Sequence, residues 1–300
     1  MANTKKARKR RIALWVEGAR LRTLPLAVAP VAAGVGAAAS VQGSKPLLAV
    51  LALFVALFLQ IGVNFSNDYS DGIRGTDAKR VGPLRLTGSG SIKPKQVKLA
   101  AFIFFGLAAL TGLAIVLITG FWWLVAVGVV AILAAWFYTG GAKPYGYAAL
   151  GDLAVFIFFG VVATVGTSYI QLGYFDNNSI VASIATGSFA SAVLMVNNIR
   201  DIDLDRHVGK KTLAVLVGKK IAKAIFIFEI WLPIAILVFF ALSYPATFFA
   251  LAAVLLVAPA TLIVLTAKTP KELILVLKIT SMAALIFGLL LGYGLSIVAV

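Results

Sequence analysis

Two clusters of aspartate and asparagine contain the oxygen ligands that hard metal ions prefer. The first cluster lies in the stretch NFSNDYSDGIRGTD and comprises Asn64, Asn67, Asp68, Asp71 and Asp77. The second lies in NNIRDIDLDRH and comprises Asn197, Asn198, Asp201, Asp203 and Asp205. The clusters share a spacing at an offset of 134 residues: Asn64, Asn67 and Asp71 correspond to Asn198, Asp201 and Asp205. Steps of three and four residues place such side chains on one face of a helix.

Clustered carboxylates beside basic residues favour a divalent metal that binds an anionic substrate. Mg²⁺ commonly takes one or two carboxylates, water and substrate phosphates. We therefore predict Mg²⁺ as the cofactor, with ligands among Asn67, Asp68, Asp71, Asp77, Asp201 and Asp205. Carboxylates alone would repel a diphosphate, so the metal must reverse the local charge. The nearby cations expected to bind the diphosphate are Arg74, Lys79, Arg80, Arg85, Arg206, Lys210 and Lys211.

Other metal and catalytic chemistries fit the chain poorly. The chain has no cysteine, which excludes disulfides, thiolate metal sites and cysteine nucleophiles. His207 is its one histidine, which disfavours a histidine zinc site or a catalytic triad. Neither cluster fits the spacing of an EF-hand. For Asp203, which lies off the shared helical face, a ligand role and a solvated role stay open.

The composition indicates an all-α polytopic membrane protein. Of 300 residues, 61% are hydrophobic and 13% are charged, against about 25% charged in a soluble domain. A membrane span needs roughly 20 mainly apolar residues, and isolated strands cannot cross lipid. We predict a single domain over 1–300 with nine transmembrane helices. They cover about 24–41, 47–67, 98–118, 121–138, 149–170, 179–199, 221–242, 246–267 and 280–299.

The basic residues predict the orientation of these helices. With the N-terminus inside, the inner segments and adjoining helix ends hold 26 of the 27 Lys and Arg residues, and only Lys45 lies outside. Inner loops of membrane proteins are rich in Lys and Arg. We therefore expect a cytoplasmic N-terminus, an outer C-terminus and an active site on the cytoplasmic side. Topology accounts for the net charge of +16, so no nucleic-acid partner is expected.

The N-terminal segment is basic, MANTKKARKRR, and only Ile12–Val16 follows as an apolar run. A secretory signal needs an apolar region of roughly 7–15 residues, so a cleaved signal is disfavoured. We predict a basic disordered tail over 1–11 and an interfacial helix over 12–22.

The longest inner segments, 68–97 and 200–220, each open with one acidic cluster. This placement suggests two related halves, with the spans 47–67 and 179–199 as counterparts. A transporter is the main alternative in another functional class. Transporters place coupling residues near the membrane midplane, whereas these acids gather at helix ends.

At these residues the chain resembles the UbiA superfamily of intramembrane prenyltransferases. The superfamily carries NDxxD-like and DxxxD-like motifs on its second and sixth helices, here Asn67-Asp68-x-x-Asp71 and Asp201-x-x-x-Asp205. Within it, the chain is most similar to the 1,4-dihydroxy-2-naphthoate polyprenyltransferases of menaquinone synthesis. The similar segments are RTLPLAVAP, NDYSDGIRGTD, YTGGAKPYGYAALGD and NNIRDIDLDRHVGKKTLAV.

The resemblance implies a reaction and its partners. Metal-bound polyprenyl diphosphate ionises, and the allylic cation is attacked by dihydroxynaphthoate at the carbon that bears the carboxyl group. Loss of CO₂ then gives a demethylmenaquinone in the plasma membrane. Another aromatic acceptor, such as 4-hydroxybenzoate, is the alternative within this class. No protein partner is expected.

Within this reaction we expect catalytic roles for Asp71, Asp201, Asp205 and Asp152. Asp152 either orients or deprotonates an acceptor hydroxyl, or is an acid favoured at a helix N-terminus. Further substrate contacts are expected from Asn64, Asn67, Asn198, Arg22, Lys143 and Tyr145. For Lys143 a topological charge is the alternative, and for Arg22 an interfacial anchor. Glu229, inside a span, is either functional or reaches the interface.

Overall fold

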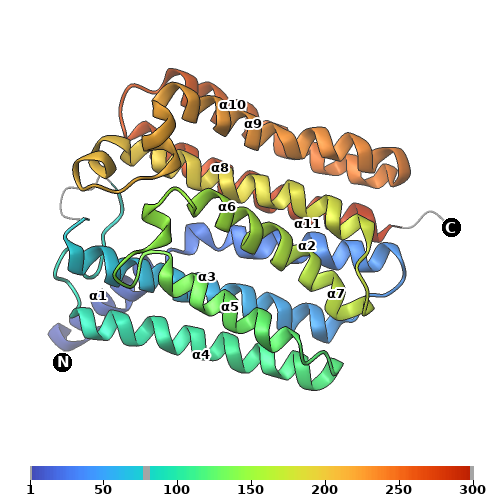
Figure 1. The fold of residues 1–300 in the computed structure, drawn as a ribbon, viewed down its shortest axis with the longest axis horizontal. Helices are drawn as coiled ribbons and strands as arrows, with labels where there is room; N and C mark the ends of the chain where they lie inside the picture. Colours follow the sequence, from blue (N-terminus) through green and yellow to red (C-terminus); the bar gives the residue numbers. More distant parts are fainter. Residues whose placement is uncertain (1, 77–81, 298–300) are drawn as a thin grey trace.

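The computed structural model describes residues 2–76 and 82–297, with side chains from residue 11 onward, as a bundle of long helices (Figure 1). The elements are α1 Ala2–Ala19, η1 Leu21–Thr23, α2 Pro25–Ser40, α3 Pro46–Arg74, α4 Pro94–Thr119, α5 Leu124–Phe137, η2 Tyr145–Tyr147, α6 Gly151–Val155, η3 Phe156–Val165, α7 Gly166–Leu172, α8 Asn177–His207, α9 Leu213–Ser243, η4 Pro245–Ala253, α10 Val254–Thr266 and α11 Glu272–Ser296. The predicted all-α fold class is confirmed for the described residues.

The count of nine transmembrane helices is not confirmed. In the described part of the chain, seven helices are long and apolar enough to cross a membrane. An eighth results if Arg11–Thr23 and Pro25–Ser40, which meet at a 46° bend, form one span. The predicted span 121–138 contains only the 14-residue helix α5. At 1.5 Å per residue, α5 is about 21 Å long, shorter than a hydrocarbon core of about 30 Å.

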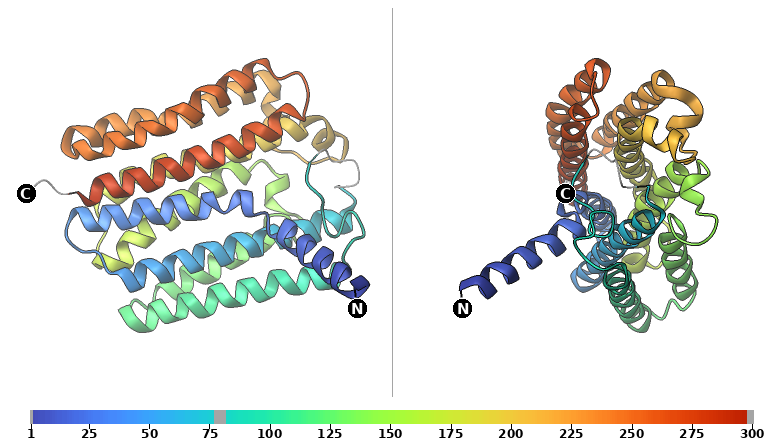
Figure 2. Two further views of the ribbon diagram at one scale, coloured as in Figure 1. Left: turned by 180° about the vertical axis from the view of Figure 1, so that it is seen from behind. Right: turned by 90° about the vertical axis from the view of Figure 1, so that its left-hand side faces the viewer.

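The segment predicted as a disordered tail over 1–11 is helical in the structure from residue 2 onward. Helix α1 begins at Ala2 and continues to Ala19, and it projects from one end of the bundle (Figure 2). Ala, Lys and Arg, which dominate this segment, are all favourable helix formers. The helix predicted over 12–22 is therefore the second half of a longer one, followed by the short turn η1.

Local sequence signals mark the ends of the helices. Proline occupies the first position of α2, α3 and α4, where its missing N–H costs no hydrogen bond. Gly75, Gly120 and Gly173 end α3, α4 and α7 in the left-handed conformation that glycine adopts without strain. Asp176 caps α8 by accepting a 2.8 Å hydrogen bond from the N–H of Ser179.

Glycine permits close packing of α2 against α11. A Cβ atom on Gly36 would lie 2.3 Å from backbone atoms of Gly292, and one on Gly288 would lie 2.5 Å from the carbonyl oxygen of Ala29. Such contacts bring backbones together, as small residues do in membrane helices. These glycines therefore serve packing. Around them, the main apolar core joins α8, α9, α10 and α11.

The two cluster helices extend past the spans that hydropathy predicts. Helix α3 ends at Arg74 and α8 at His207, so Asp68, Asp71, Asp201 and Asp205 are all helical. Apolar composition locates the membrane boundary, but a helix continues beyond it where no breaker intervenes. Both C-terminal ends lie at the same end of the bundle (Figure 1).

Candidate active site

A cavity of about 640 Å³ joins the two clusters. Its polar end is lined by three residues of α3, Asn64, Asn67 and Asp71, and by three of α8, Asn198, Asp201 and Asp205. The six residues with the shared spacing therefore meet at one cavity. The rest of the cavity runs between α3, α4, α5 and η3, where alanine, valine, leucine and phenylalanine predominate. Such a shape suits an amphiphilic ligand with a polar head and an apolar tail.

Asp71 is 7% exposed and lies at the last turn of α3. The Tyr147 hydroxyl donates a 2.7 Å hydrogen bond to its Oδ1. One turn earlier, Asn67 Oδ1 accepts a 2.8 Å hydrogen bond from the hydroxyl of Thr139. The loop after α5 is thus bonded directly to the first cluster.

Asp68 performs a different task from its neighbours. Its Oδ2 accepts a 2.8 Å hydrogen bond from the N–H of Leu86, and its Oδ1 accepts one of 2.8 Å from Thr87. The carboxylate is 1% exposed and does not line the cavity. It anchors the segment that follows α3, and this places Arg85 on the cavity wall. The arrangement favours a loop anchor over the metal ligand predicted for Asp68.

In the second cluster, Arg200 binds Asp201 through two hydrogen bonds, 2.7 Å from Nε and 2.6 Å from Nη2. Arg200 also donates a 2.8 Å hydrogen bond to Asn197 Oδ1. Lys210 Nζ lies 3.7 Å from Asp205 Oδ1. Two hydrogen bonds from one arginine fix the orientation of a carboxylate. The α8 side of the cavity is therefore preorganised, and it carries both positive and negative side chains.

Tyr147 connects the two clusters. Its backbone carbonyl accepts a 3.1 Å hydrogen bond from the N–H of Lys211, while its hydroxyl reaches Asp71. Lys210 Nζ lies 5.2 Å and the Arg74 guanidinium carbon 5.7 Å from the centre of its ring, within range of a cation–π interaction. Burial raises the pKa of Tyr147, and the Asp71 carboxylate raises it further, so the phenol stays a neutral donor.

The remaining predicted residues divide into two groups. Arg22, Arg85, Tyr145 and Lys210 line the cavity. Arg74 does not, because its guanidinium donates hydrogen bonds to the carbonyls of Thr139 and Gly141. Exposed residues outside the cavity lining are Lys143, Arg206 and Lys211. Asp77, Lys79 and Arg80 lie outside the described residues.

Asp152 and Glu229 are partly or fully buried, but neither lines the cavity. Each has one carboxylate oxygen without a hydrogen-bond partner among the described residues. A direct contact between Asp152 and the acceptor therefore stays a prediction. Asp203 is exposed on α8, which supports its solvated role.

Several polar residues of the cavity were not predicted from the sequence, among them Arg20, Thr23 and Gln60. Gln60 stands one turn before Asn64 on α3, so the spacing of the first cluster extended by four residues would have found it. Arg20 and Thr23 belong to a tight turn, and no spacing rule connects that turn to α3.

The polar end suits a divalent cation shared with a substrate. Within the described ranges, no three acidic or histidine side chains come close enough to hold a metal by themselves. Mg²⁺ needs only one or two carboxylates when water and phosphate complete its shell. Asp71, Asp201 and Asp205 are buried carboxylates at one cavity, so the donor set fits.

Glycines widen the apolar part of the cavity. Gly112 of α4, Gly128 of α5 and Gly166 of α7 line it, and a Cβ at any of them would meet no atom within 4 Å. Glycine inside a helix is less stable than alanine by roughly 0.5–1 kcal/mol. Packing does not explain these three glycines. The neighbouring π-helical η3 contributes Phe158 and Phe159 to the same wall.

The fold and the cavity define an all-α membrane protein whose cavity suits a ligand with an anionic head and an apolar tail. The chain belongs to the UbiA prenyltransferase family, whose model matches residues 27–282. It is therefore a prenyltransferase.

Named relatives agree with this membership, and a solved structure shares the fold. The chain is 46% identical to a 1,4-dihydroxy-2-naphthoate octaprenyltransferase of Mycobacterium tuberculosis, over 95% of this chain and 97% of the relative. It is 37% identical to an enzyme of the same name from Haemophilus influenzae, over 98% and 99%. A UbiA homologue from Archaeoglobus fulgidus, solved with GPP and Mg²⁺, shares the fold with a TM-score of 0.65 at 17% identity, over 93% and 99%.

Proposed function

We propose that this protein transfers a polyprenyl group from polyprenyl diphosphate to 1,4-dihydroxy-2-naphthoate in menaquinone synthesis. The observation that carries the proposal is the meeting of both acidic clusters at one cavity with an apolar extension. Relatives of that name at 46% and 37% identity support the choice of acceptor.

The diphosphate would bind at the polar end. Arg22, Arg85 and Lys210 line this end and supply positive charge. Asp71, Asp201 and Asp205 would hold Mg²⁺, which stabilises negative charge on the departing pyrophosphate when it is bound. The bidentate contact from Arg200 keeps Asp201 oriented before any substrate arrives.

The prenyl chain would occupy the apolar part of the cavity. Breaking of its C–O bond releases pyrophosphate and leaves an allylic cation, which bulk water would capture. The apolar walls exclude water, and the rings of Tyr138 and Tyr145 line the cavity close to its polar end. The acceptor carbon that bears the carboxyl group forms the new C–C bond. The electrons of the lost carboxyl bond restore the aromatic ring as CO₂ leaves.

An assay with two acceptors tests this proposal. Purified protein in lipid would receive Mg²⁺, a polyprenyl diphosphate and either dihydroxynaphthoate or 4-hydroxybenzoate, with products identified by mass spectrometry. We expect a decarboxylated prenyl naphthalene product that disappears when Mg²⁺ is chelated. Exclusive prenylation of 4-hydroxybenzoate would reject the proposed acceptor, and no prenyl transfer to either ring would reject the reaction.

We also propose that the polar end faces the cytoplasm, with the N-terminus inside and the C-terminus outside the plasma membrane. The support is the distribution of Lys and Arg, of which only Lys45 belongs to the opposite side. Because the chain has no cysteine, single cysteines report the topology directly. In intact cells an impermeant maleimide should label N177C and not S89C, two exposed positions on opposite sides. The reverse pattern would overturn the orientation.

A further inference from the structure

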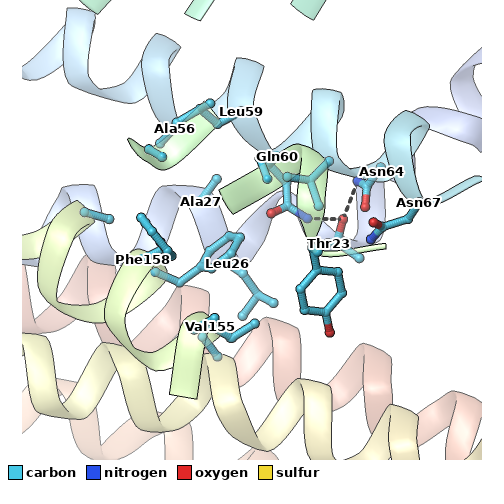
Figure 3. Close-up of a pocket in the computed structure, with 18 of the residues that line it drawn as sticks. Thr23, Leu26, Ala27, Ala56, Leu59, Gln60, Asn64, Asn67, Val155 and Phe158 are labelled. Atoms are coloured by element: carbon cyan, nitrogen blue, oxygen red, sulfur yellow. Dashed lines mark hydrogen bonds between the residues drawn. The ribbon is translucent and has the colours of Figure 1, made fainter. Parts of the chain in front are cut away.

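Gln60 is a buried polar residue on the cavity wall that the proposed mechanism leaves unused. It lies on α3 one turn before Asn64, on the face that carries the first cluster, and it is 6% exposed. Its neighbours on the wall include the apolar side chains of Leu26, Leu59 and Phe158 (Figure 3). Gln60 therefore stands where the polar end of the cavity passes into its apolar part.

The orientation of the Gln60 amide is fixed by Thr23. Gln60 Nε2 and Asn64 Nδ2 each donate a 3.0 Å hydrogen bond to the Thr23 hydroxyl oxygen (Figure 3). The hydroxyl in turn donates its proton to the carbonyl of Arg20 at 2.9 Å. If the amide were flipped, Gln60 Oε1 would face the Thr23 hydroxyl oxygen, whose one proton is already donated to the carbonyl of Arg20. The amide nitrogen is thus committed to Thr23.

Gln60 Oε1 has no hydrogen-bond partner among the described residues, although it is fully buried. Buried polar atoms are nearly always hydrogen-bonded, so an unpaired acceptor beside a cavity points to a ligand that supplies a donor. An ionised diphosphate has no proton to donate, and a prenyl chain is a hydrocarbon. A phenolic hydroxyl on the aromatic acceptor has the required chemistry.

The position of Gln60 along α3 agrees with this ligand. Seven residues separate it from Asn67, which corresponds to about 10 Å along a helix. It is therefore too deep to share a metal with Asp71. It lies below the expected head group, at the level where the first prenyl carbon and the acceptor ring must meet.

We propose that Gln60 Oε1 accepts a hydrogen bond from a ring hydroxyl of the aromatic acceptor and thereby determines acceptor specificity. Thr23 is the positioning residue that turns the amide oxygen toward the ring. This inference rests on the proposed function, because it names the contact that selects a hydroxylated ring.

Binding of acceptor analogues tests the proposal without relying on turnover. Dissociation constants would be measured for 1,4-dihydroxy-2-naphthoate, 1-hydroxy-2-naphthoate and 4-hydroxy-2-naphthoate. The wild type should prefer the dihydroxy ligand over one monohydroxy ligand by at least about tenfold, because a site built to bind a hydroxyl rejects the analogue that lacks it. Gln60→Met, which keeps the length of the side chain, should abolish this preference and leave KM for prenyl diphosphate within about twofold.

Gln171 provides a matched control. It is 1% exposed, donates to the carbonyl of Thr167 at 2.8 Å and accepts from the N–H of Lys45 at 2.9 Å, away from the cavity lining. Gln171→Met should keep the acceptor preference of the wild type. Thr23→Val, which releases the Gln60 amide, should reduce the preference at least about threefold, and it tests the contact even if Gln60→Met does not fold.

The possible outcomes separate the two proposals. If the wild type prenylates dihydroxynaphthoate but Gln60→Met and Thr23→Val keep its preference between ligands, the role of Gln60 is wrong and the proposed function stands. If the wild type prenylates no naphthoate at all, the proposed function fails first. A loss of preference in Gln171→Met equal to that in Gln60→Met would also overturn the assignment.

Discussion

The Tyr147 hydroxyl lies 2.7 Å from Asp71 Oδ1, and the same residue accepts a backbone hydrogen bond from Lys211. One tyrosine of the loop after α5 thus joins the end of α3 to the segment after α8. The two acidic clusters are held at one cavity by this loop as well as by helix packing.

Replacement of Tyr147 by Phe should lower activity more than stability. The variant loses one hydrogen bond to a charged acceptor, whose net worth is about 1.5–3 kcal/mol, and Asp71 loses its orientation. We expect kcat to fall by about tenfold or more, while thermal unfolding moves by a few degrees. Tyr174→Phe, at an exposed tyrosine that does not line the cavity, is the control. Normal kcat in Tyr147→Phe would show that the link has no role in turnover.

Replacement of Asp68 by Asn should disturb the loop rather than the metal. One amide oxygen can still accept from Leu86 or Thr87, but the amide nitrogen would face the other N–H and leave it unpaired. An unpaired buried donor costs about 1–3 kcal/mol. We expect lower thermal stability and a higher KM for prenyl diphosphate through displacement of Arg85, with an unchanged Mg²⁺ dependence. A shift in the Mg²⁺ concentration for half-maximal activity would instead make Asp68 a ligand.

Variants at two glycines of α4 can distinguish an effect on cavity volume from an effect on helix stability. A Cβ would meet no atom at Gly106 or at Gly112, but only Gly112 lines the cavity. Leucine at either position should strengthen the helix slightly, because glycine is a poor helix former. Gly112→Leu should reduce turnover of a long prenyl diphosphate several-fold, and Gly106→Leu should not, in parallel steady-state assays. Equal effects would mean that the prenyl chain does not use this wall.

Tyr145 should make the free energy of unfolding depend on pH in the alkaline range. Burial raises its pKa to about 12, whereas an unfolded tyrosine titrates near 10. Above pH 10 the unfolded chain therefore binds fewer protons than the native protein, and the free energy of unfolding falls as pH rises toward 12. Tyr145→Phe should weaken the decline in melting temperature between pH 9.5 and 11, and Tyr174→Phe should not. These pH values follow from the two pKa values. An unchanged decline in Tyr145→Phe would contradict the buried phenol.

Much of the site was predictable because it depends on helical periodicity. The repeated steps of three and four residues in the two clusters predicted shared faces, and the structure brings those faces to one cavity. Side-chain direction on a helix follows from spacing alone. Asp68 shows the limit, since it neighbours Asn67 but points to a loop whose path no local rule determines.

Contacts between distant segments were not predictable in this way. Tyr147 reaches Asp71 across 76 positions, and Gln60 meets Thr23 across 37. Such contacts depend on how loops close over helix ends. The fold class followed from hydropathy, but the number of spans did not, because an apolar run such as 121–138 includes turn residues and yields only the short helix α5.

The central claim is that Asp71 and Asp205 act together on one Mg²⁺–diphosphate head group. A double-mutant cycle in the binding of an unreactive prenyl thiolodiphosphate, with and without Mg²⁺, tests it most directly. We predict that Asp71→Asn and Asp205→Asn each weaken Mg²⁺-dependent binding at least about tenfold, and that the double variant is at most about threefold weaker than either. A double variant whose loss of affinity equals the product of the two single losses would contradict a shared site. Binding that persists undiminished after Mg²⁺ is removed would contradict it as well.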